Sequence, residues 1–207
     1  MKEWIIKDYK DTAVDWAKVP ALEINEYPWY EGGLKQETKA QLAIYQDRIY
    51  IHAKAQDKYI RHDAKELNDP VYEDSCFEFF VTPWDHKSQS YFNIEINCMG
   101  VLYMAYKDGK GGKKMISKEQ SRQISIKSSL KESKDIDKES GWELEIIIPI
   151  GLLEEISEKE IKKDVWYGNF YRCGGKEDDQ YASWNPIEFE KPSFHQPMQF
   201  GRLIIQE

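Results

Sequence analysis

The 207-residue sequence has no excess of positive charge and few cysteines. Its formal net charge of -8 argues against a nucleic-acid partner, because such binding depends on clustered Lys and Arg. The three cysteines, Cys76, Cys98 and Cys173, are odd in number and widely separated, with no CxxC pair. This pattern favours reduced thiols over a disulfide framework or a zinc site. A single bridge between Cys76 and Cys98 is conceivable but not expected.

A long apolar run is also missing. The first sixteen residues, MKEWIIKDYKDTAVDW, contain no stretch of the length that a signal peptide or a membrane span needs. We therefore expect no membrane association. The sequence as given predicts a cytoplasmic location, or an extracellular one if a leader has been removed.

What the sequence does contain is many aromatic residues. They make up 14% of the chain, including seven Trp and thirteen Tyr, which suits a β-rich fold or a carbohydrate-binding surface. A chain of this length can bury one substantial core, and β-sandwiches of this size are commonly one domain. We expect a single domain over residues 1–207.

Short runs of alternating apolar and polar residues predict many strands. Residues 41–45 and 48–55 form two such runs, joined at Gln46 and Asp47, and residues 101–106, 124–126, 142–148, 166–173 and 200–205 give further strands. A helical period appears clearly once, where Leu152, Leu153, Ile156 and Ile161 share one face. The predicted fold is an antiparallel β-sandwich of jelly-roll or immunoglobulin-like type, with one or two short helices.

The most specific stretch of the chain is 72–106, which predicts a β-hairpin. Its first strand places Phe77, Phe79 and Val81 on one face, and its second places Phe92, Ile94 and Ile96 on the matching face. The opposite face is polar and carries acids and amides: Glu78, Asn93, Glu95 and Asn97. A symmetric fold would set Glu78 opposite or diagonal to Glu95, although like charges across a ladder are destabilising.

This polar face has two interpretations. It is either a solvated sheet face without a function, or a row of groups that hydrogen-bond the hydroxyls of a sugar. A late loop containing Trp184-Asn185-Pro186 poses a similar choice, because Trp184 either folds back onto the core or offers a flat ring on which a pyranose stacks.

Several motifs together resemble a known family. The segments DPVYEDSCFEFFVTP, YFNIEINCMGVLY, GNFYRCGGKEDDQYASWNPI and PSFHQPMQFGRLI occur in this order between about residues 22 and 205. They are similar to the family 9 carbohydrate-binding modules, and most similar to stand-alone bacterial proteins of that type. The combination of the DSCFEFF and SWNP segments carries most of the resemblance.

The resemblance implies a non-catalytic β-sandwich that holds an oligosaccharide or polysaccharide, often by its reducing end, between two aromatic rings. Carried over by position, these rings are Tyr72, where the family usually has Trp, and Trp184. The polar ligand-binding candidates are Glu78, Asn93, Glu95, Asn97, Asn169 and Arg172. No cofactor is required, but family members also carry structural calcium, for which Asp178 and Asp179 are the candidates here. The sugar, the linkage and the oligomeric state are left open.

Two other functions are consistent with the same residues. A glycoside hydrolase would use Glu78 and Glu95 as its carboxylate pair, which requires a separation of about 5 to 10 Å and one raised pKa. A β-sandwich without a sugar site would instead bind another protein or haem. Haem would need an axial ligand such as His52, His195 or Met104, and their spacing singles out none of them.

Overall fold

The computed structural model describes residues 1–10, 13–30, 32–131, 141–175 and 180–207. In this part of the chain nearly all regular structure is β. The strands are β1 (Glu3–Tyr9), β2 (Ala21–Glu23), β3 (Thr38–Tyr45), β4 (Arg48–Gln56), β5 (Ser75–Thr82), β6 (Tyr91–Asn97), β7 (Leu102–Lys107), β8 (Lys113–Met115), β9 (Ser125–Ser128), β10 (Gly141–Pro149), β11 (Val165–Gly174), β12 (Tyr181–Ser183) and β13 (Gly201–Gln206). Two short helices, α1 (Lys118–Ser121) and α2 (Ile150–Ser157), complete it.

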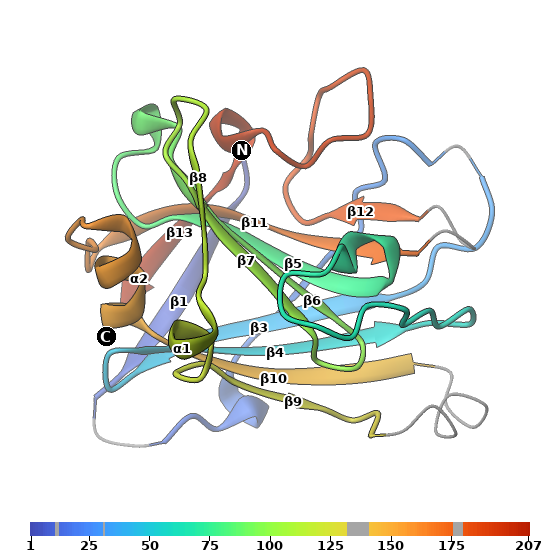
Figure 1. The fold of residues 1–207 in the computed structure, drawn as a ribbon, viewed down its shortest axis with the longest axis horizontal. Coiled ribbons are helices and arrows are strands. Elements are labelled where there is room, and N and C mark those ends of the chain that lie inside the picture. Colours follow the sequence, from blue (N-terminus) through green and yellow to red (C-terminus); the bar gives the residue numbers. More distant parts are fainter. Residues whose placement is uncertain (11–12, 31, 132–140, 176–179) are drawn as a thin grey trace.

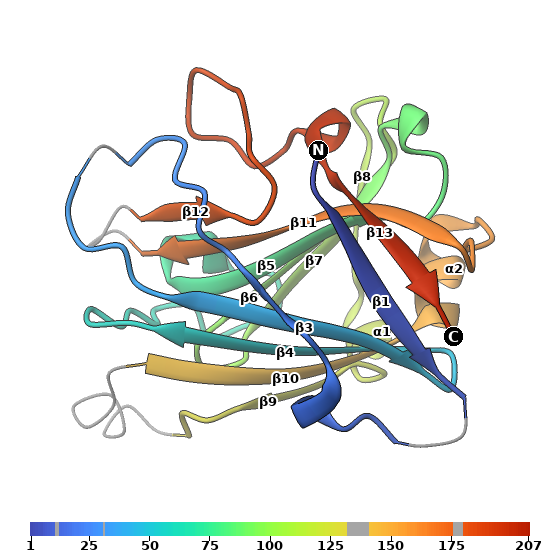
Figure 2. The same cartoon turned by 180° about the vertical axis from the view of Figure 1, so that it is seen from behind.

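The strands form a β-sandwich made from one curled sheet. One layer runs in the order β8, β7, β6, β5 and β11, and the other in the order β3, β4, β10 and β9 (Figure 1). Strands β13 and β1 lie side by side and connect the two layers (Figure 2). The predicted sandwich is confirmed, with one difference. Strand β1 pairs in parallel with both β13 and β3, so the sheet is mixed and not purely antiparallel.

The hairpin of β3 and β4 follows directly from its turn residues. Gln46 and Asp47 both have positive φ, 50° and 52°, as a two-residue turn requires when its twist matches that of the strands. The ladder starts at the pair Tyr45 and Arg48, so the turn lies where the sequence predicted it. Because side chains alternate, Leu42 and Ile51 on these strands point between the layers.

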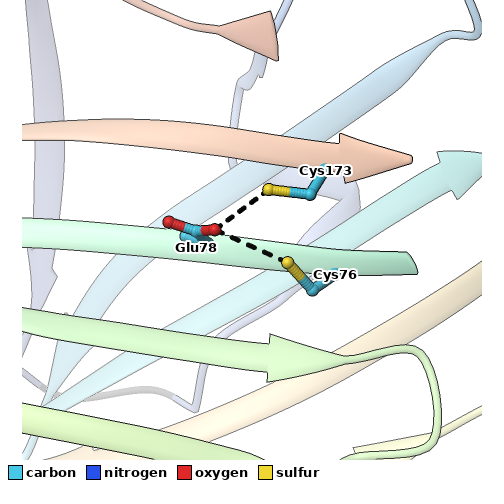
Figure 3. A group of neighbouring side chains, drawn as sticks. All are labelled: Cys76, Glu78 and Cys173. Atoms are coloured by element: carbon cyan, nitrogen blue, oxygen red, sulfur yellow. Dashed lines mark hydrogen bonds between the residues drawn. The ribbon is translucent and has the colours of Figure 1, made fainter. Parts of the chain in front are cut away.

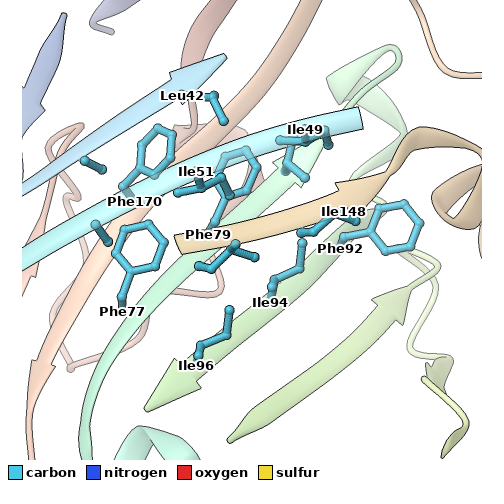
Figure 4. Packing of buried hydrophobic residues seen from close by; sticks show 14 of the residues in the cluster. Leu42, Ile49, Ile51, Phe77, Phe79, Phe92, Ile94, Ile96, Ile148 and Phe170 are labelled. Carbon is cyan, nitrogen blue, oxygen red and sulfur yellow. The ribbon is translucent and has the colours of Figure 1, made fainter. Parts of the chain in front are cut away.

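The core fills the space between the two layers (Figure 4). Phe77 and Phe79 from β5 contact Phe170 from β11, and the ring centroids of Phe79 and Phe170 are 4.6 Å apart in a stacked arrangement. The apolar face predicted for the 72–106 hairpin is confirmed, since all six of its members are buried: Phe77, Phe79, Val81, Phe92, Ile94 and Ile96.

The opposite face of the hairpin is buried as well. Every residue of β5 and β6 is buried, although alternation alone predicted one polar face. A second apolar cluster lies over this face and includes Phe194 and Phe200 from the segment that precedes β13. This covering segment leaves a hollow above the polar residues of the hairpin.

The helices are small additions to the sandwich. Helix α2 covers Leu152, Leu153 and Ile156 of the predicted helical pattern but ends at Ser157, so Ile161 lies beyond it. The C-cap residue Glu158 has a left-handed backbone with φ of 57°. Neither α1 nor α2 has the length or the apolar surface to span a bilayer, and no other helix in the described residues does.

Candidate functional site

Two buried glutamates form the floor of the hollow. Glu78 on β5 lies directly opposite Glu95 on β6, as the symmetric hairpin register predicted. Both point to the face away from the core, because they alternate with Phe77, Phe79 and Ile94. Their relative exposures are only 2% and 5%. Two acids held face to face at such burial are unfavourable for the fold, which suggests a function for the pair.

A pocket of about 260 Å³ opens above this floor. Its size is near the small end of ligand pockets, which span about 300 to 1,000 Å³, so it suits a ligand of about one sugar ring. Five groups of residues line it. The floor comes from β5, β6 and β11, one wall from the turn before β5, and the others from the segment before β3, from β12 and from the segment before β13: Trp29, Tyr72, Glu78, Phe80, Glu95, Cys173, Tyr181, Pro192, Ser193, Phe194 and His195.

One wall is a fixed set of aromatic rings. Phe194 stacks on Tyr171 with centroids 4.2 Å apart and meets the rings of Trp29 and Tyr181 at 5.7 and 6.0 Å. The indole Nε1 of Trp29 donates a hydrogen bond of 2.7 Å to the carbonyl of Phe189. Since each ring is held by its neighbours, this wall is arranged before any ligand arrives.

Tyr72 stands on another wall and is 52% exposed. It lies in the single turn η2 (Val71–Glu73), directly before β5. The turn is held from below, because the buried carboxylate of Asp74 accepts hydrogen bonds from the backbone of Asp63 and Ala64. An exposed ring on an anchored turn is suited to stacking on the apolar face of a sugar.

The environment of the floor disfavours the ionised form of both glutamates. Burial raises the pKa of Glu78 well above its usual value, and the facing Glu95 raises it further. Burial also raises the pKa of Glu95, to about 7, although the Asn93 amide and the charges of Lys107 and Lys113 partly offset it. The pair therefore holds at least one proton near neutral pH, so it can both donate and accept hydrogen bonds to hydroxyl groups.

His195 lines the side of the pocket that is nearest to Lys107 and Lys113. The residue is exposed as a whole, but its ring stacks on Phe80 at 5.2 Å and its Nδ1 lies 2.9 Å from the hydroxyl of Tyr91. Desolvation of the ring and the charges of Lys107 and Lys113 lower the pKa of His195. A neutral imidazole offers a ligand one donor or one acceptor.

The structure corrects the stacking role predicted for Trp184. This residue is 3% exposed and belongs to the core cluster, where its ring packs edge-on against Phe170 with centroids 6.0 Å apart. A Cβ added to Gly201 would lie 2.3 Å from the Trp184 ring, so the space on that side is full as well. The other interpretation of the sequence, a tryptophan folded back onto the core, is the correct one. Trp29 supplies the indole in the pocket instead.

Two of the predicted polar ligands are buried supports instead. The amide of Asn97 donates to Asp74 at 2.9 Å, and so anchors the turn that carries Tyr72. Asn169 donates to the carbonyl of Asn185 at 3.0 Å and accepts from its backbone N–H at 2.8 Å. These bonds fix the start of the segment that carries Phe194 and His195. Both amides already hydrogen-bond groups of the protein, so neither is placed to hold a ligand.

Arg172 and Asn93 also lie outside the pocket lining. Arg172 points into the core, where it donates to Asp57 at 2.6 Å and lies 5.1 Å from the ring centroid of Trp142. It alternates with Cys173 on β11, which explains why it faces the opposite side from the pocket. Asn93 is buried beside Glu95, whose pKa it lowers. Of the predicted ligands, only Tyr72, Glu78 and Glu95 line the pocket.

Several pocket residues were missed by the sequence predictions. Trp29 belongs to an aromatic cluster with Tyr27 and Tyr30 that is visible in the sequence. Such a cluster is equally consistent with a ligand-binding wall and with side chains that fill the end of a sandwich. Strand alternation gives a signal for two of them. Phe80 lies on the same face of β5 as Glu78, and Cys173 lies on the opposite face of β11 from Arg172. Pro192 to His195 give no signal, since their position depends on how a long segment folds.

The floor also contains a group of potential metal ligands. Among the described residues, Cys76, Glu78 and Cys173 bring one ligand atom each to within 4.8 Å of one another (Figure 3). This set does not suit calcium, which takes oxygen ligands only and at least six of them. The calcium candidates Asp178 and Asp179 lie outside the described residues. Of the alternative haem ligands, His52 bonds Gln41 and Glu143 and Met104 lies in the core, whereas His195 lines the pocket.

Comparisons with known proteins agree with this architecture. A crystal structure from Bacteroides uniformis, named as a candidate carbohydrate-binding protein, is 28% identical, with 99% of each chain covered and a TM-score of 0.86. Two structures of a family 9 carbohydrate-binding module from Caldicellulosiruptor kristjanssonii, in complex with glucose and with cellotriose, are each 14% identical. Their TM-scores are 0.64 and 0.65, with 99% of this chain and 96% and 94% of theirs covered, which shows a shared fold.

No curated protein has a sequence that matches this chain. The model of a protein family, by contrast, matches residues 8–205, nearly the whole sequence. The resemblance in the motifs is thus confirmed, and the chain belongs to carbohydrate-binding family 9.

Proposed function

We propose that this protein binds a saccharide, without cleaving it, in the pocket above Glu78 and Glu95. One observation carries the proposal, namely that an exposed ring, Tyr72, and a paired carboxyl floor line the same small pocket. Membership of a carbohydrate-binding family and the glucose and cellotriose bound by structural neighbours support the choice of ligand.

In this proposal the sugar ring stacks on Tyr72 and faces the wall of Trp29 and Phe194. Its hydroxyls hydrogen-bond the carboxyl groups of Glu78 and Glu95, which are stronger partners than neutral amides when ionised. The pocket volume of about 260 Å³ favours one terminal sugar unit over the middle of a polymer. A chain end held in this way matches the recognition of reducing ends that the family resemblance implied.

The first test is isothermal titration with glucose and a series of cello-oligosaccharides and other oligosaccharides. The Tyr72→Ala variant loses the stacking surface, and we expect about tenfold weaker binding, or about 1.4 kcal/mol. Tyr59→Ala is the matched control, because Tyr59 is also an exposed tyrosine, 46% accessible, but lies outside the pocket. Equal effects of the two substitutions, or no saccharide binding by the unmodified protein, would refute the proposal.

A second experiment tests recognition of the reducing end. The best oligosaccharide of the panel is reduced with borohydride, which opens its terminal ring and leaves the rest of the chain unchanged. We expect binding to disappear if the pocket holds that ring. Undiminished binding would assign another part of the saccharide to the pocket.

Glycoside hydrolysis is the competing function, because Glu78 and Glu95 both have raised pKa values. A hydrolase needs its two carboxyl groups to flank the scissile bond. Here they stand side by side on one sheet face, in directly paired positions, and approach a ligand from the same side. Release of reducing sugar on long incubation, abolished by Glu78→Gln, would nevertheless decide for hydrolysis.

A further inference from the structure

The floor of the pocket contains a second chemical feature, in which Glu78 lies beside two cysteines that sugar binding does not use. Cys76 and Cys173 lie directly opposite each other on β5 and β11, and Glu78 is two residues further along the same face of β5. The Sγ atoms of Cys173 and Cys76 lie 3.1 and 3.6 Å from the same carboxylate oxygen, Oε1 of Glu78 (Figure 3). All three residues are at most 2% exposed.

These separations are close to those within a tetrahedral zinc site. Bonds of about 2.3 Å to sulfur and about 2.0 Å to oxygen, at tetrahedral angles, set a sulfur and an oxygen ligand about 3.5 Å apart. The two S···O separations here are 3.1 and 3.6 Å, and the whole group fits within 4.8 Å. The two S···O separations thus differ from the tetrahedral value by only a few tenths of an ångström.

A separate observation points to a ligand at this place. Oε2 of Glu95 is buried and has no hydrogen-bond partner among the residues that the structure describes, which is costly for a carboxyl oxygen. Glu95 faces Glu78 across the ladder, and both line the pocket together with Cys173. A cation can therefore reach the cluster through the pocket, where a water held by Glu95 could complete its coordination.

We propose that Cys76, Cys173 and Glu78 bind a thiophilic divalent cation of the Zn²⁺ type, with its fourth position toward Glu95 and the pocket. Two thiolates and a carboxylate select such an ion over Ca²⁺ or Mg²⁺, which prefer oxygen ligands. Each thiol gives its proton to solvent as its sulfur bonds the metal, the Glu78 carboxyl releases its proton in the same way where it is protonated, and no electron is transferred. The charges of Lys107 and Lys113, which act on Glu95, help to balance the surplus of negative ligands.

The test uses the full chain, reduced with a phosphine, stripped with EDTA and titrated with Co²⁺ and then with Zn²⁺. We expect a thiolate-to-cobalt charge-transfer band and intense visible bands of a tetrahedral site, both displaced by one equivalent of Zn²⁺. Cys76→Ser and Cys173→Ser should weaken Zn²⁺ binding at least about 100-fold. Cys98→Ser is the matched control, because Cys98 is also a buried free thiol but lies outside the cluster.

Circular dichroism and thermal unfolding show whether each variant is folded. If a cysteine variant does not fold, Glu78→Gln supplies the same test, since it removes a ligand and keeps the shape of the side chain. The proposal is overturned if the reduced protein gives no charge-transfer band, or if the band depends on Cys98. It is also overturned if mass spectrometry of the isolated protein shows a disulfide between Cys76 and Cys173.

Discussion

At the residue scale, the least expected feature is the pair of buried glutamates. A fold that only needed a β-hairpin would place apolar residues at positions 78 and 95, as it does at the neighbouring positions on the core side. The desolvation of each carboxyl and their mutual repulsion weaken the fold. This cost is understandable if a ligand takes up the free hydrogen-bonding capacity of the pair.

The raised pKa of Glu95 predicts how stability depends on pH in the metal-free protein. Unfolded, this group ionises near 4.5, whereas in the folded protein it ionises near 7. Its contribution is therefore complete below pH 4.5 and is lost as the pH rises to about 7, where it costs no more than about 3 kcal/mol. We expect Glu95→Gln to remove this fall, measured as the difference in urea unfolding free energy between variant and wild type from pH 4.5 to 8. A difference that stays constant over this range would show that burial does not shift the carboxyl.

At the scale of elements, the pocket depends on segments that are tied down at their ends. The wall of Phe194 and His195 belongs to a long connection between β12 and β13, which has little regular structure of its own. Its first residues are held by Asn169 on β11 through both polar atoms of the amide. The residue that supports this wall, Asn169, therefore belongs to strand β11 and not to the wall itself.

We expect Asn169→Ala to loosen this connection. The variant leaves the backbone N–H of Asn185 without its partner, and the C=O of Asn185 keeps only the hydrogen bond from the Ser183 hydroxyl. This should cost about 1 to 3 kcal/mol in unfolding free energy. Hydrogen exchange should become faster over residues 186–199, and saccharide affinity should fall. Asn25→Ala is the control, because the Asn25 amide bonds only the exposed Glu23. Unchanged exchange in the 186–199 segment would mean that the connection is held by other contacts.

At the scale of the whole molecule, Trp184 and Trp29 serve different purposes: Trp184 contributes to the stability of the fold, and Trp29 to the proposed binding pocket. Trp184 lies in the core between the layers, so Trp184→Ala should lower the unfolding free energy by about 3 to 5 kcal/mol. Trp29 is half-buried in the pocket wall, so Trp29→Ala should cost much less stability and mainly weaken saccharide binding. Thermal unfolding and titration of both variants check this. The assignment fails if Trp29→Ala is the more destabilising of the two.

Local patterns predicted the sandwich and the turn at Gln46 and Asp47. They left Glu78 either opposite or diagonal to Glu95, and the structure shows the directly opposite pairing. These features depend on alternation and on turn geometry, which neighbouring residues determine. The sequence did not predict which tryptophan is exposed, because Trp184 and Trp29 both lie outside long strands and either ring suits a core or a surface. That choice depends on the packing of segments more than 150 residues apart, such as Trp29 and the carbonyl of Phe189.

The place of β1 between β13 and β3 has a consequence for biosynthesis. The two layers are joined through β13 and β1, which are separated by nearly the whole described sequence. During translation β1 must therefore wait for residues 201–206 to leave the ribosome before the sheet can close. Contacts between residues far apart in a sequence are slow to form, so we expect a late-closing nascent chain that depends on protection of its unpaired edges until β13 has been synthesised.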